Sequence, residues 1–289
     1  MSAVESSSPL LVPSAPYKKT RGMGRVGGTL HTWRTLRACW VLDFKAAVKF
    51  RFDMVIGTGV NIIWLFFAIA PVLVAGKFLG DGDGWTQPRL LFLQAIWYWM
   101  DAIMWVFCFG SIQRLAEDVR VGTLDGQLLL PTSSLARTML GHLSVQDLPK
   151  VVIALALGGY AIWAGAMPGG LWSILAFIVC LLAASVIFWC VAVFSSYKVM
   201  TLREFDGTVA LNAMHNLGRM PVDMYGPILR IFLSSIFPVV LITTVPSRVF
   251  FGWSSWWLPL VSVAVAVVLV VVLRLAWNRE VRNYIGLQN

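Results

Sequence analysis

Charged residues are scarce in this sequence. Asp, Glu, Lys and Arg make up 13% of its 289 residues, whereas hydrophobic residues make up 58% and the mean hydropathy is +0.76. Soluble globular domains carry about 25% charged residues, because their surfaces must be solvated. The shortage of charge therefore excludes an ordinary soluble domain and predicts a protein that crosses a membrane several times.

Motifs for nucleotide binding, metal binding and covalent catalysis are also absent. The sequence contains no GxxxxGK[ST] loop, no HExxH and no GxSxG. The histidines His31, His142 and His215 stand far apart, and none has a metal-ligand partner at helical spacing. The four cysteines form no CxxC pair, so neither a disulfide framework nor a metal site is indicated. We therefore expect no catalytic residue, no metal and no cofactor on this chain.

Six apolar segments have about the 20 residues that a helix needs to cross a bilayer. Pro149 and Lys150 weaken the third segment, and Arg230 and Pro238 interrupt the fifth. The pattern predicts an all-α membrane protein with six transmembrane helices. The predicted spans are residues 54–76, 91–112, 148–166, 171–195, 226–245 and 257–277.

Positive charge is distributed unevenly between the two sides of these spans. Of the 23 lysines and arginines, all but Lys77, Arg89 and Arg248 fall in the two ends of the chain, the second loop or the fourth loop. Lys and Arg are retained on the cytoplasmic side, so both termini are predicted to be cytoplasmic. The net charge of +9 then favours contact with anionic membrane lipids, and no contact with nucleic acid is expected.

The N-terminal part divides into an arm and a helix. Residues 1–29 have no apolar core and are rich in Ser, Pro, Gly and basic residues, so we expect a disordered basic arm rather than a signal peptide. Residues 30–289 then form one membrane domain. Within residues 30–50, Trp33, Trp40 and Phe44 share one helix face, which predicts an amphipathic helix in the cytoplasmic membrane interface. The alternative is a helix packed on a partner protein.

Asp101 is the main polar anomaly inside a predicted span. A carboxylate facing lipid there costs about 2.5–3.5 kcal/mol, so Asp101 should face a cavity or another helix. Trp97, Asp101 and Trp105 recur every four residues and share one helix face. One interpretation is a substrate pathway that contacts a polar or cationic cargo. The other is a protonated Asp that hydrogen-bonds to a neighbouring helix.

Two polar connectors are expected on the cytoplasmic side. Residues 113–120, QRLAEDVR, predict a short charged helix that Gly122 ends in a left-handed conformation. The apolar run after Gly122 stops at Pro131, and because exposed leucines are unfavourable, we expect this segment to dock on a soluble partner. The second connector, residues 196–225, predicts a cytoplasmic helical extension that ends near Gly218.

The stretch GTLDGQLLLP resembles the loop signature G-x-L-D-x-x-L-L-x-P found in one branch of the ATP-binding-cassette (ABC) type-two transport permeases. Residues 220–252 are similar to the fifth span of that branch, and the C-terminal WNREVRNYIG resembles its closing W-x-x-x-x-R-x-Y. Two residues depart from the pattern: Ser247 replaces the usual Ala, and Phe237 precedes the fifth-span proline. These departures concern the subfamily, and hence the cargo, more than the fold. The matching loop residues are Gly122, Leu124, Asp125, Leu128, Leu129 and Pro131.

The resemblance implies a six-span permease domain that pairs with a second permease, identical or related, as a dimer. Two copies of a separate ATPase subunit would bind ATP and Mg, and this chain would be no enzyme itself. In such permeases a cytoplasmic coupling helix after the second span sits in a groove of the ATPase. The residues to which this role would fall are Gln113, Arg114, Glu117, Asp118 and Arg120, with the loop-signature residues fixing the helix against the membrane.

The function implied is that of an exporter in a bacterial plasma membrane, moving a lipid, a hydrophobic drug or a natural product. The candidate contacts for the cargo are Trp97, Asp101 and Trp105. The alternative is a proton-coupled secondary transporter that uses Asp101 as its proton carrier.

Overall fold

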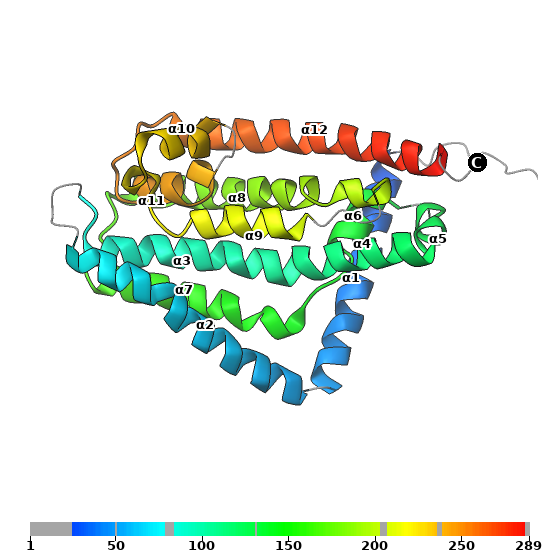
Figure 1. Ribbon diagram of the computed structural model, residues 1–289, viewed down its shortest axis with the longest axis horizontal. Helices are drawn as coiled ribbons and strands as arrows, with labels where there is room; N and C mark the ends of the chain where they lie inside the picture. Colours follow the sequence, from blue (N-terminus) through cyan, green and yellow to red (C-terminus); the bar gives the residue numbers. More distant parts are fainter. Residues whose placement is uncertain are drawn as a thin grey trace, which may run out of the picture.

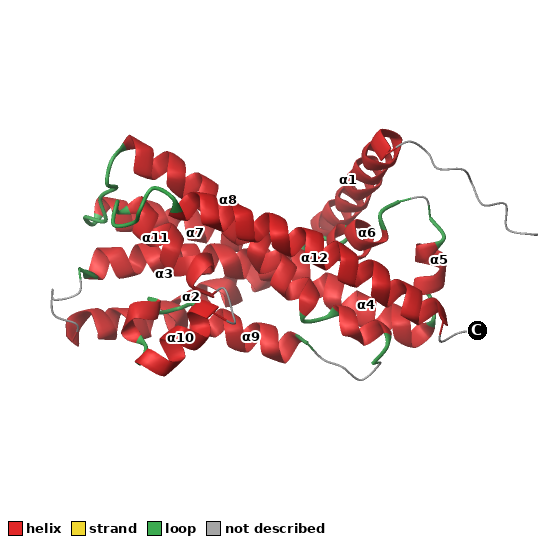
Figure 2. Ribbon diagram, turned by 90° about the horizontal axis from the view of Figure 1, so that it is seen from above, coloured by secondary structure: helices red, strands yellow, loops and turns green. Residues whose placement is uncertain are grey.

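The computed structural model describes residues 25–49, 51–78, 84–130, 132–202, 207–235 and 239–286. Every regular element within these ranges is a helix (Figure 2). Residues 1–24 of the predicted arm lie outside the described ranges, and the first helix begins within that arm. The α-helices are α1 (Arg25–Lys49), α2 (Arg51–Phe78), α3 (Gln87–Ile103), α4 (Gly110–Val121), α5 (Leu124–Leu128), α6 (Ser134–Leu140), α7 (Pro149–Trp163), α8 (Leu171–Phe194), α9 (Thr208–Leu217), α10 (Pro227–Ser235), α11 (Val245–Phe250) and α12 (Leu258–Gly286).

Shorter turns of other helix types connect these elements. Two are π-helices, in which the backbone hydrogen bonds skip one more residue than in an α-helix. They are η2 (Met104–Phe109) and η6 (Val240–Thr244). The 3₁₀ turns are η3 (Val145–Asp147), η4 (Tyr197–Met200) and η5 (Val222–Met224).

Five helices in the described residues are long and apolar enough to cross a membrane. Each overlaps one of the predicted spans, so the first, second, third, fourth and sixth predicted segments are confirmed as long apolar helices. Pro149 is compatible with the third because it occupies the first turn of α7, where its missing N–H would have no helical partner. The five are Phe52–Val74, Gln87–Val121, Val145–Trp163, Leu171–Met200 and Leu258–Ile285.

The fifth predicted segment, residues 226–245, has a different form. In the described residues α10 ends at Ser235, and helix resumes as η6 and α11, which continue past the predicted end to Phe250. Pro238 lies between them, outside the described ranges. Arg230 in α10 forms an ion pair with Asp223 of η5 at 3.2 Å. A sixth membrane span therefore stays a prediction, although α9, α10 and α11 carry the chain from the end of α8 back to the start of α12, at the other end of the bundle (Figure 1).

The centre of the bundle is formed by α3. In its apolar window 72% of the residues are buried, against 17% for the windows in α2 and α12. It packs most extensively against α7, while α12 packs against α8. The main hydrophobic cluster includes Leu90, Leu93 and Met100 of α3 together with Ile187 and Phe188 of α8. The outer helices α2 and α12 keep large apolar side chains exposed, as helices that face lipid do.

One end of the bundle holds α1 and the connector between the second and third predicted spans. The helices α1, α4, α5 and α6 and the C-terminal end of α12 lie there together (Figure 1). Unlike the spans, α1 runs across the bundle axis. It is hydrogen-bonded to α6, since Trp40 Nε1 donates to the carbonyl oxygen of Leu140 at 2.7 Å. Trp33 and Phe44 remain exposed on α1. Residues 30–49 are helical, whereas the amphipathic character of this helix and its position in the membrane interface stay predictions.

Candidate functional site

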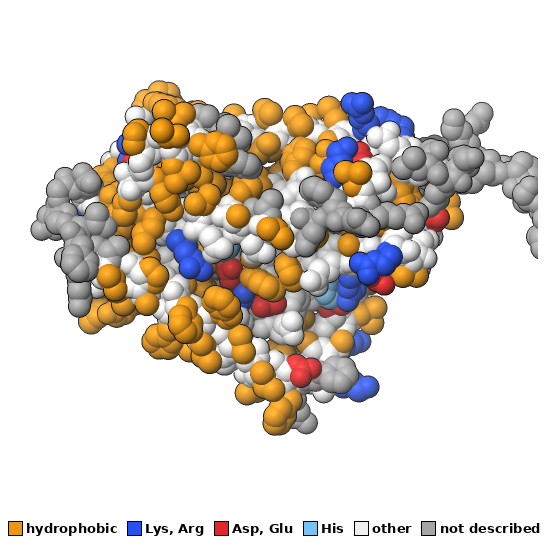
Figure 3. Space-filling model, viewed as in Figure 1, with side chains coloured by type: hydrophobic (Ala, Val, Ile, Leu, Met, Phe, Trp, Pro, Cys, Tyr) orange, Lys and Arg blue, Asp and Glu red, His pale blue; other side chains and the backbone are white. Residues whose placement is uncertain are grey.

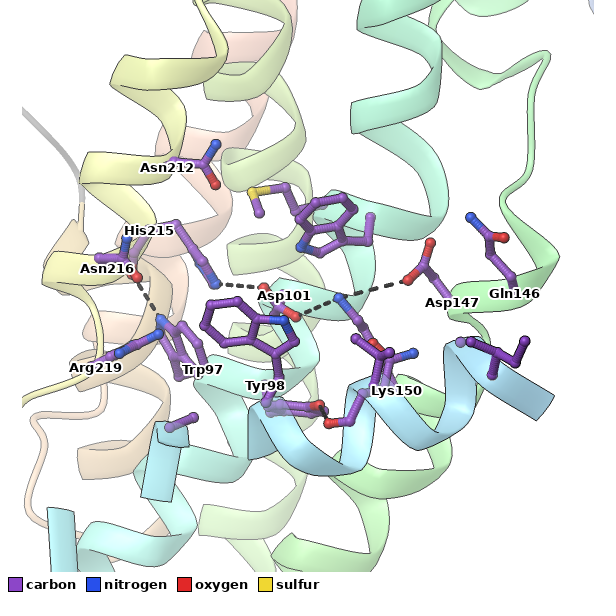
Figure 4. Close-up of a pocket in the computed structure, with 18 of the residues that line it drawn as sticks. Trp97, Tyr98, Asp101, Gln146, Asp147, Lys150, Asn212, His215, Asn216 and Arg219 are labelled. Carbon is purple, nitrogen blue, oxygen red and sulfur yellow. Dashed lines mark hydrogen bonds and ion pairs between the residues drawn. The ribbon is translucent and has the colours of Figure 1, made fainter. Parts of the chain in front are cut away.

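A cavity of about 730 Å³ lies among α2, α3, α7 and α9 (Figure 4). Its volume falls in the range of about 300–1,000 Å³ that is typical of ligand sites. The residues that line it are Asp53, Ile56, Gly57, Val60, Asn61, Trp64 and Ala68 of α2, Trp97, Tyr98, Asp101, Met104 and Trp105 of α3 and η2, Gln146, Asp147 and Lys150 at the start of α7, and Asn212, His215, Asn216 and Arg219 in and after α9.

A network of charged side chains crosses the middle of the cavity. Asp101 Oδ2 accepts from Lys150 Nζ at 2.9 Å, and Asp101 Oδ1 lies 3.1 Å from His215 Nε2. Lys150 Nζ also lies 3.7 Å from Asp147 Oδ1, and Ser144 Oγ donates to the same carboxylate at 2.7 Å. Because all the ionisable members are buried, each needs the others to offset its loss of hydration. The network therefore links α3, α7 and α9.

Aromatic rings support this network on both sides. His215 stacks on the ring of Trp97 at 4.4 Å between centroids, and Trp97 Nε1 donates to the His215 carbonyl oxygen at 2.7 Å. Lys150 Nζ lies 4.5 Å from the ring centre of Trp105, and the guanidinium carbon of Arg219 lies 4.5 Å from that of Trp97. These are cation–π distances. The indoles thus hold the cationic side chains in place.

The shape of α3 beyond Asp101 explains how Lys150 reaches it. The π-helix η2 follows within one turn, and the Val106 carbonyl oxygen inside it accepts from the backbone N–H of Ser144 at 2.9 Å. A Cβ on Gly110 would approach His142 Cδ2 to 2.7 Å, so glycine permits the loop to pass close to the helix. The loop before α7 is thereby docked on α3, which brings the first turn of α7 to the acid.

The structure places all three predicted cargo residues, Trp97, Asp101 and Trp105, in the cavity wall. Asp101 also accepts a hydrogen bond from Lys150 of α7, a cation, at 2.9 Å. The protonated Asp101 of the second interpretation stays a prediction. Contact with cargo stays a prediction.

The sequence analysis does not assign Lys150, His215 or Arg219 to the cavity. His215 belongs to the connector that the sequence predicts to be a cytoplasmic extension, whereas its side chain is only 6% exposed and lies beside Asp101 within the bundle. The helix of that connector, α9, ends before Gly218 as predicted, yet it packs on α8 within the bundle. Asn212, His215, Asn216 and Arg219 follow the spacing i, i+3, i+4, i+7, and this helical pattern is the signal that could have identified a polar face.

A second candidate site is residues 113–130, which we call the inner elbow after the cytoplasmic side on which the sequence predicts them. Its first part is not a separate short helix, because α3, η2 and α4 form one continuous helical stretch of 35 residues, Gln87–Val121. Such a stretch is about 52 Å long, whereas the hydrocarbon core is about 30 Å thick. The charged end of α4 therefore extends beyond the core. Gly122 ends it at φ 81°, in the predicted left-handed conformation.

The turn of the elbow is held by one carboxylate. Asp118 accepts from Thr123 Oγ1 and from Gln127 Nε2, both at 2.7 Å, and so joins α4 to α5 across Gly122. Leu124 is fully buried below the turn, and Leu129 is 76% exposed. Pro131 lies outside the described residues. Of the other predicted coupling residues, Leu128 is half-buried, and the exposed ones are Gln113, Arg114, Glu117, Arg120 and Asp125.

The elbow packs on the C-terminal end of α12. Trp277 Nε1 donates to Ser134 Oγ at 3.1 Å, just after the loop signature. Trp277 and Tyr284 share one hydrophobic cluster with Leu124 and Leu128. Two sequence blocks that carried the family resemblance, far apart along the chain, thus meet at one end of the molecule.

Among the described residues, no group of three or more His, Cys, Asp or Glu side chains is placed to hold a metal ion. Residues 60–287 match a protein-family model described as "ABC-2 family transporter protein". Neither the curated proteins nor the solved structures gave a match. The matched range contains the inner elbow and the cavity walls formed by α3, α7 and α9.

Proposed function

This chain belongs to the ABC-2 transporter family, and from that premise we propose that it is the permease of an ATP-driven exporter powered by a separate ATPase subunit. The observation that carries the proposal is the family match over residues 60–287, most of the chain. With several helices apolar enough to span a bilayer, the chain is a multi-pass membrane permease of an ABC transporter. Outward transport and the route of coupling are the proposed parts.

The ATPase would dock on the inner elbow. The sequence contains no GxxxxGK[ST] loop, which fits a division of labour in which ATP and Mg bind to the partner. The exposed charged side chains Arg114, Glu117, Arg120 and Asp125, together with Leu129, offer that partner a mixed polar and apolar surface. Two ATPase copies and a second permease, identical or related, would complete the complex.

Coupling would operate through the continuous helix that joins the elbow to the cavity. A displacement of α4 by the ATPase moves α3, because no loop interrupts the helix between Gln87 and Val121. Trp97 and Asp101 lie on that helix, so the cavity wall moves with it. Asp118 keeps the elbow stiff, since it fixes the angle between α4 and α5. Rigid-body movements of this kind are a common way to switch a site between two states.

The cargo would pass along the cavity wall that Trp97, Asp101 and Trp105 form. A lipid, a hydrophobic drug or a natural product fits a wall that combines aromatic rings and apolar α2 side chains with a few polar groups.

The test is the ATP turnover of the complete complex in lipid nanodiscs. We expect Asp118→Ala to lower cargo-stimulated turnover several-fold, because the carboxylate accepts two hydrogen bonds across Gly122 and the elbow bends without them. Asp125→Ala, which removes an exposed charge at the tip of the elbow, should lower turnover by weakening docking. The control is Arg274→Ala, which removes an exposed charge of α12 outside the elbow. Equal turnover in Asp118→Ala and Arg274→Ala would contradict the coupling route.

One observation also suits the secondary-transporter alternative. Asp101 belongs to a buried network with His215 and Lys150, and such networks can carry protons. That alternative requires the purified chain alone to accumulate cargo in vesicles under a pH gradient. We expect accumulation only with the ATPase and ATP, and uptake by the chain alone would favour the alternative.

A further inference from the structure

The acidic centre of the cavity is neutralised from within the protein. Both oxygens of Asp101 are engaged, one by Lys150 and the other by His215. Asp147 is shared between Lys150 and the hydroxyl of Ser144. Asp53, the third acid in the wall, is an exposed residue in the first turn of α2. The centre of the cavity therefore holds little uncompensated negative charge for a cationic cargo.

Arg219 is the exception to this pairing. It lies at the opposite end of the network from Asp147, with Asp101 between them (Figure 4). Within the described residues no carboxylate forms an ion pair with its guanidinium, and its Nε is buried without a hydrogen-bond partner. Trp97 covers one face of the guanidinium at 4.5 Å. Its N–H donors lie in the guanidinium plane, and that planar fork suits the oxygens of a phosphate or carboxylate.

A long apolar stripe faces the same cavity. Ile56, Val60, Trp64 and Ala68 of α2 all line it and stand four residues apart. Twelve residues of helix span about 18 Å, which is the length of a medium alkyl chain. Figure 3 shows the charged groups near the middle of one face of the molecule, with apolar side chains around them. A ligand entering from this face, at the depth of the apolar helices, would need an alkyl part as well as a polar group.

We propose that this cavity binds an amphiphile with an anionic oxygen group, a phosphate or a carboxylate, which Arg219 holds while the alkyl chain lies along the α2 stripe. The inference rests on the proposed function, since it names the class of cargo for the same cavity. The proposed cargo is anionic, whereas Asp101 in the sequence suggested a polar or cationic cargo. The sign changes because Lys150 neutralises the Asp101 carboxylate.

The test is equilibrium binding to the full chain in phosphatidylcholine nanodiscs, without ATPase or ATP, with empty nanodiscs as the blank. The radiolabelled probes are dodecyl phosphate, dodecyltrimethylammonium and inorganic phosphate. We expect saturable binding of dodecyl phosphate at least about tenfold tighter than of the other two probes. Equal or tighter binding of the ammonium probe would overturn the proposal. If inorganic phosphate binds as tightly as dodecyl phosphate, the alkyl chain contributes nothing. That result would overturn the proposal of an amphiphile and indicate a site for the free anion.

Variants assign the binding to Arg219. Arg219→Gln should weaken dodecyl phosphate binding about tenfold, the effect of losing one charged hydrogen-bonding group, and Arg219→Lys should retain part of the affinity. The control is Arg274→Gln, which removes an exposed arginine of α12 outside the cavity. Unchanged binding in Arg219→Gln would overturn the proposal. The binding measurement needs no ATPase, so its result does not depend on the coupling route. Likewise, the ATP-turnover test of coupling does not depend on the charge of the cargo.

Discussion

Replacing Lys150 by Met should destabilise the bundle, because it leaves Asp101 buried without its cation. Lys150 is 6% exposed and lies 2.9 Å from the Asp101 carboxylate, so water cannot readily take its place. Removing one partner of a buried ion pair costs about 3–5 kcal/mol. For a chain of this size 1 kcal/mol lowers the melting temperature by about 2–4 °C. We therefore expect a loss on the order of 10 °C.

The protein supplies its own reporter for this measurement. Cys108, Cys180 and Cys190 are buried and react with a thiol-specific dye only when the helices separate. Half-buried Cys39 is replaced by Ser to lower the background. The control is Lys45→Met, which removes an exposed lysine from α1.

A double-mutant cycle isolates the pair itself. In Asp101→Asn with Lys150→Met neither charge remains at the pair, so the double variant should lose less stability than the two single losses added together, by about 0.5–3 kcal/mol. A melting temperature of Lys150→Met equal to that of Lys45→Met would refute the reasoning, and so would strict additivity in the double variant.

Three further predictions concern packing and the elbow. Gly110→Ala should lower the melting temperature, because the new Cβ would lie 2.7 Å from His142 Cδ2; His142→Ala in the same chain should restore it, and no restoration would contradict the contact. Trp277→Ala should cost about 3–5 kcal/mol of stability. Ser134→Ala removes only the hydrogen bond to Trp277 and should cost about 1 kcal/mol. Similar losses in the two variants would count against burial of the indole ring as the main effect. Gly122→Ala should lower stimulated ATP turnover, because alanine at φ 81° strains the turn by about 1–2 kcal/mol. Gly122→Asn should lower turnover less, because Asn tolerates that conformation. The opposite order would exclude backbone strain as the cause.

Long apolar runs were the part of the fold that the sequence could predict. A run of about 20 apolar residues has few stable alternatives to a membrane helix, and five such runs are long apolar helices in the structure. The end of α4 was predictable for a similar reason, because Gly122 adopts a left-handed backbone without penalty. The shared face of Trp97, Asp101 and Trp105 follows from helical spacing alone, and all three line the cavity.

The partners of Asp101 could not be predicted in the same way. Lys150 is 49 positions away in the sequence, and its approach depends on the π-helix η2 and on the loop that docks there. His215 was placed outside the membrane because its connector is polar. That polarity is one face of α9 directed into a cavity, and only the packing of α9 on α8 reveals it. Local pattern cannot distinguish a polar helix in water from one lining an internal cavity.

The claim that a separate ATPase drives this permease through its inner elbow is tested most directly by site-specific photo-cross-linking in cells that express both proteins. A photoreactive residue is placed at Leu129, which is 76% exposed at the elbow, or at Trp256, which is 73% exposed and comes just before α12, whose first turn lies at the opposite end of the bundle (Figure 1). We predict a covalent adduct with the ATPase from Leu129 and none from Trp256. An adduct from Trp256, or from neither position, would contradict the account.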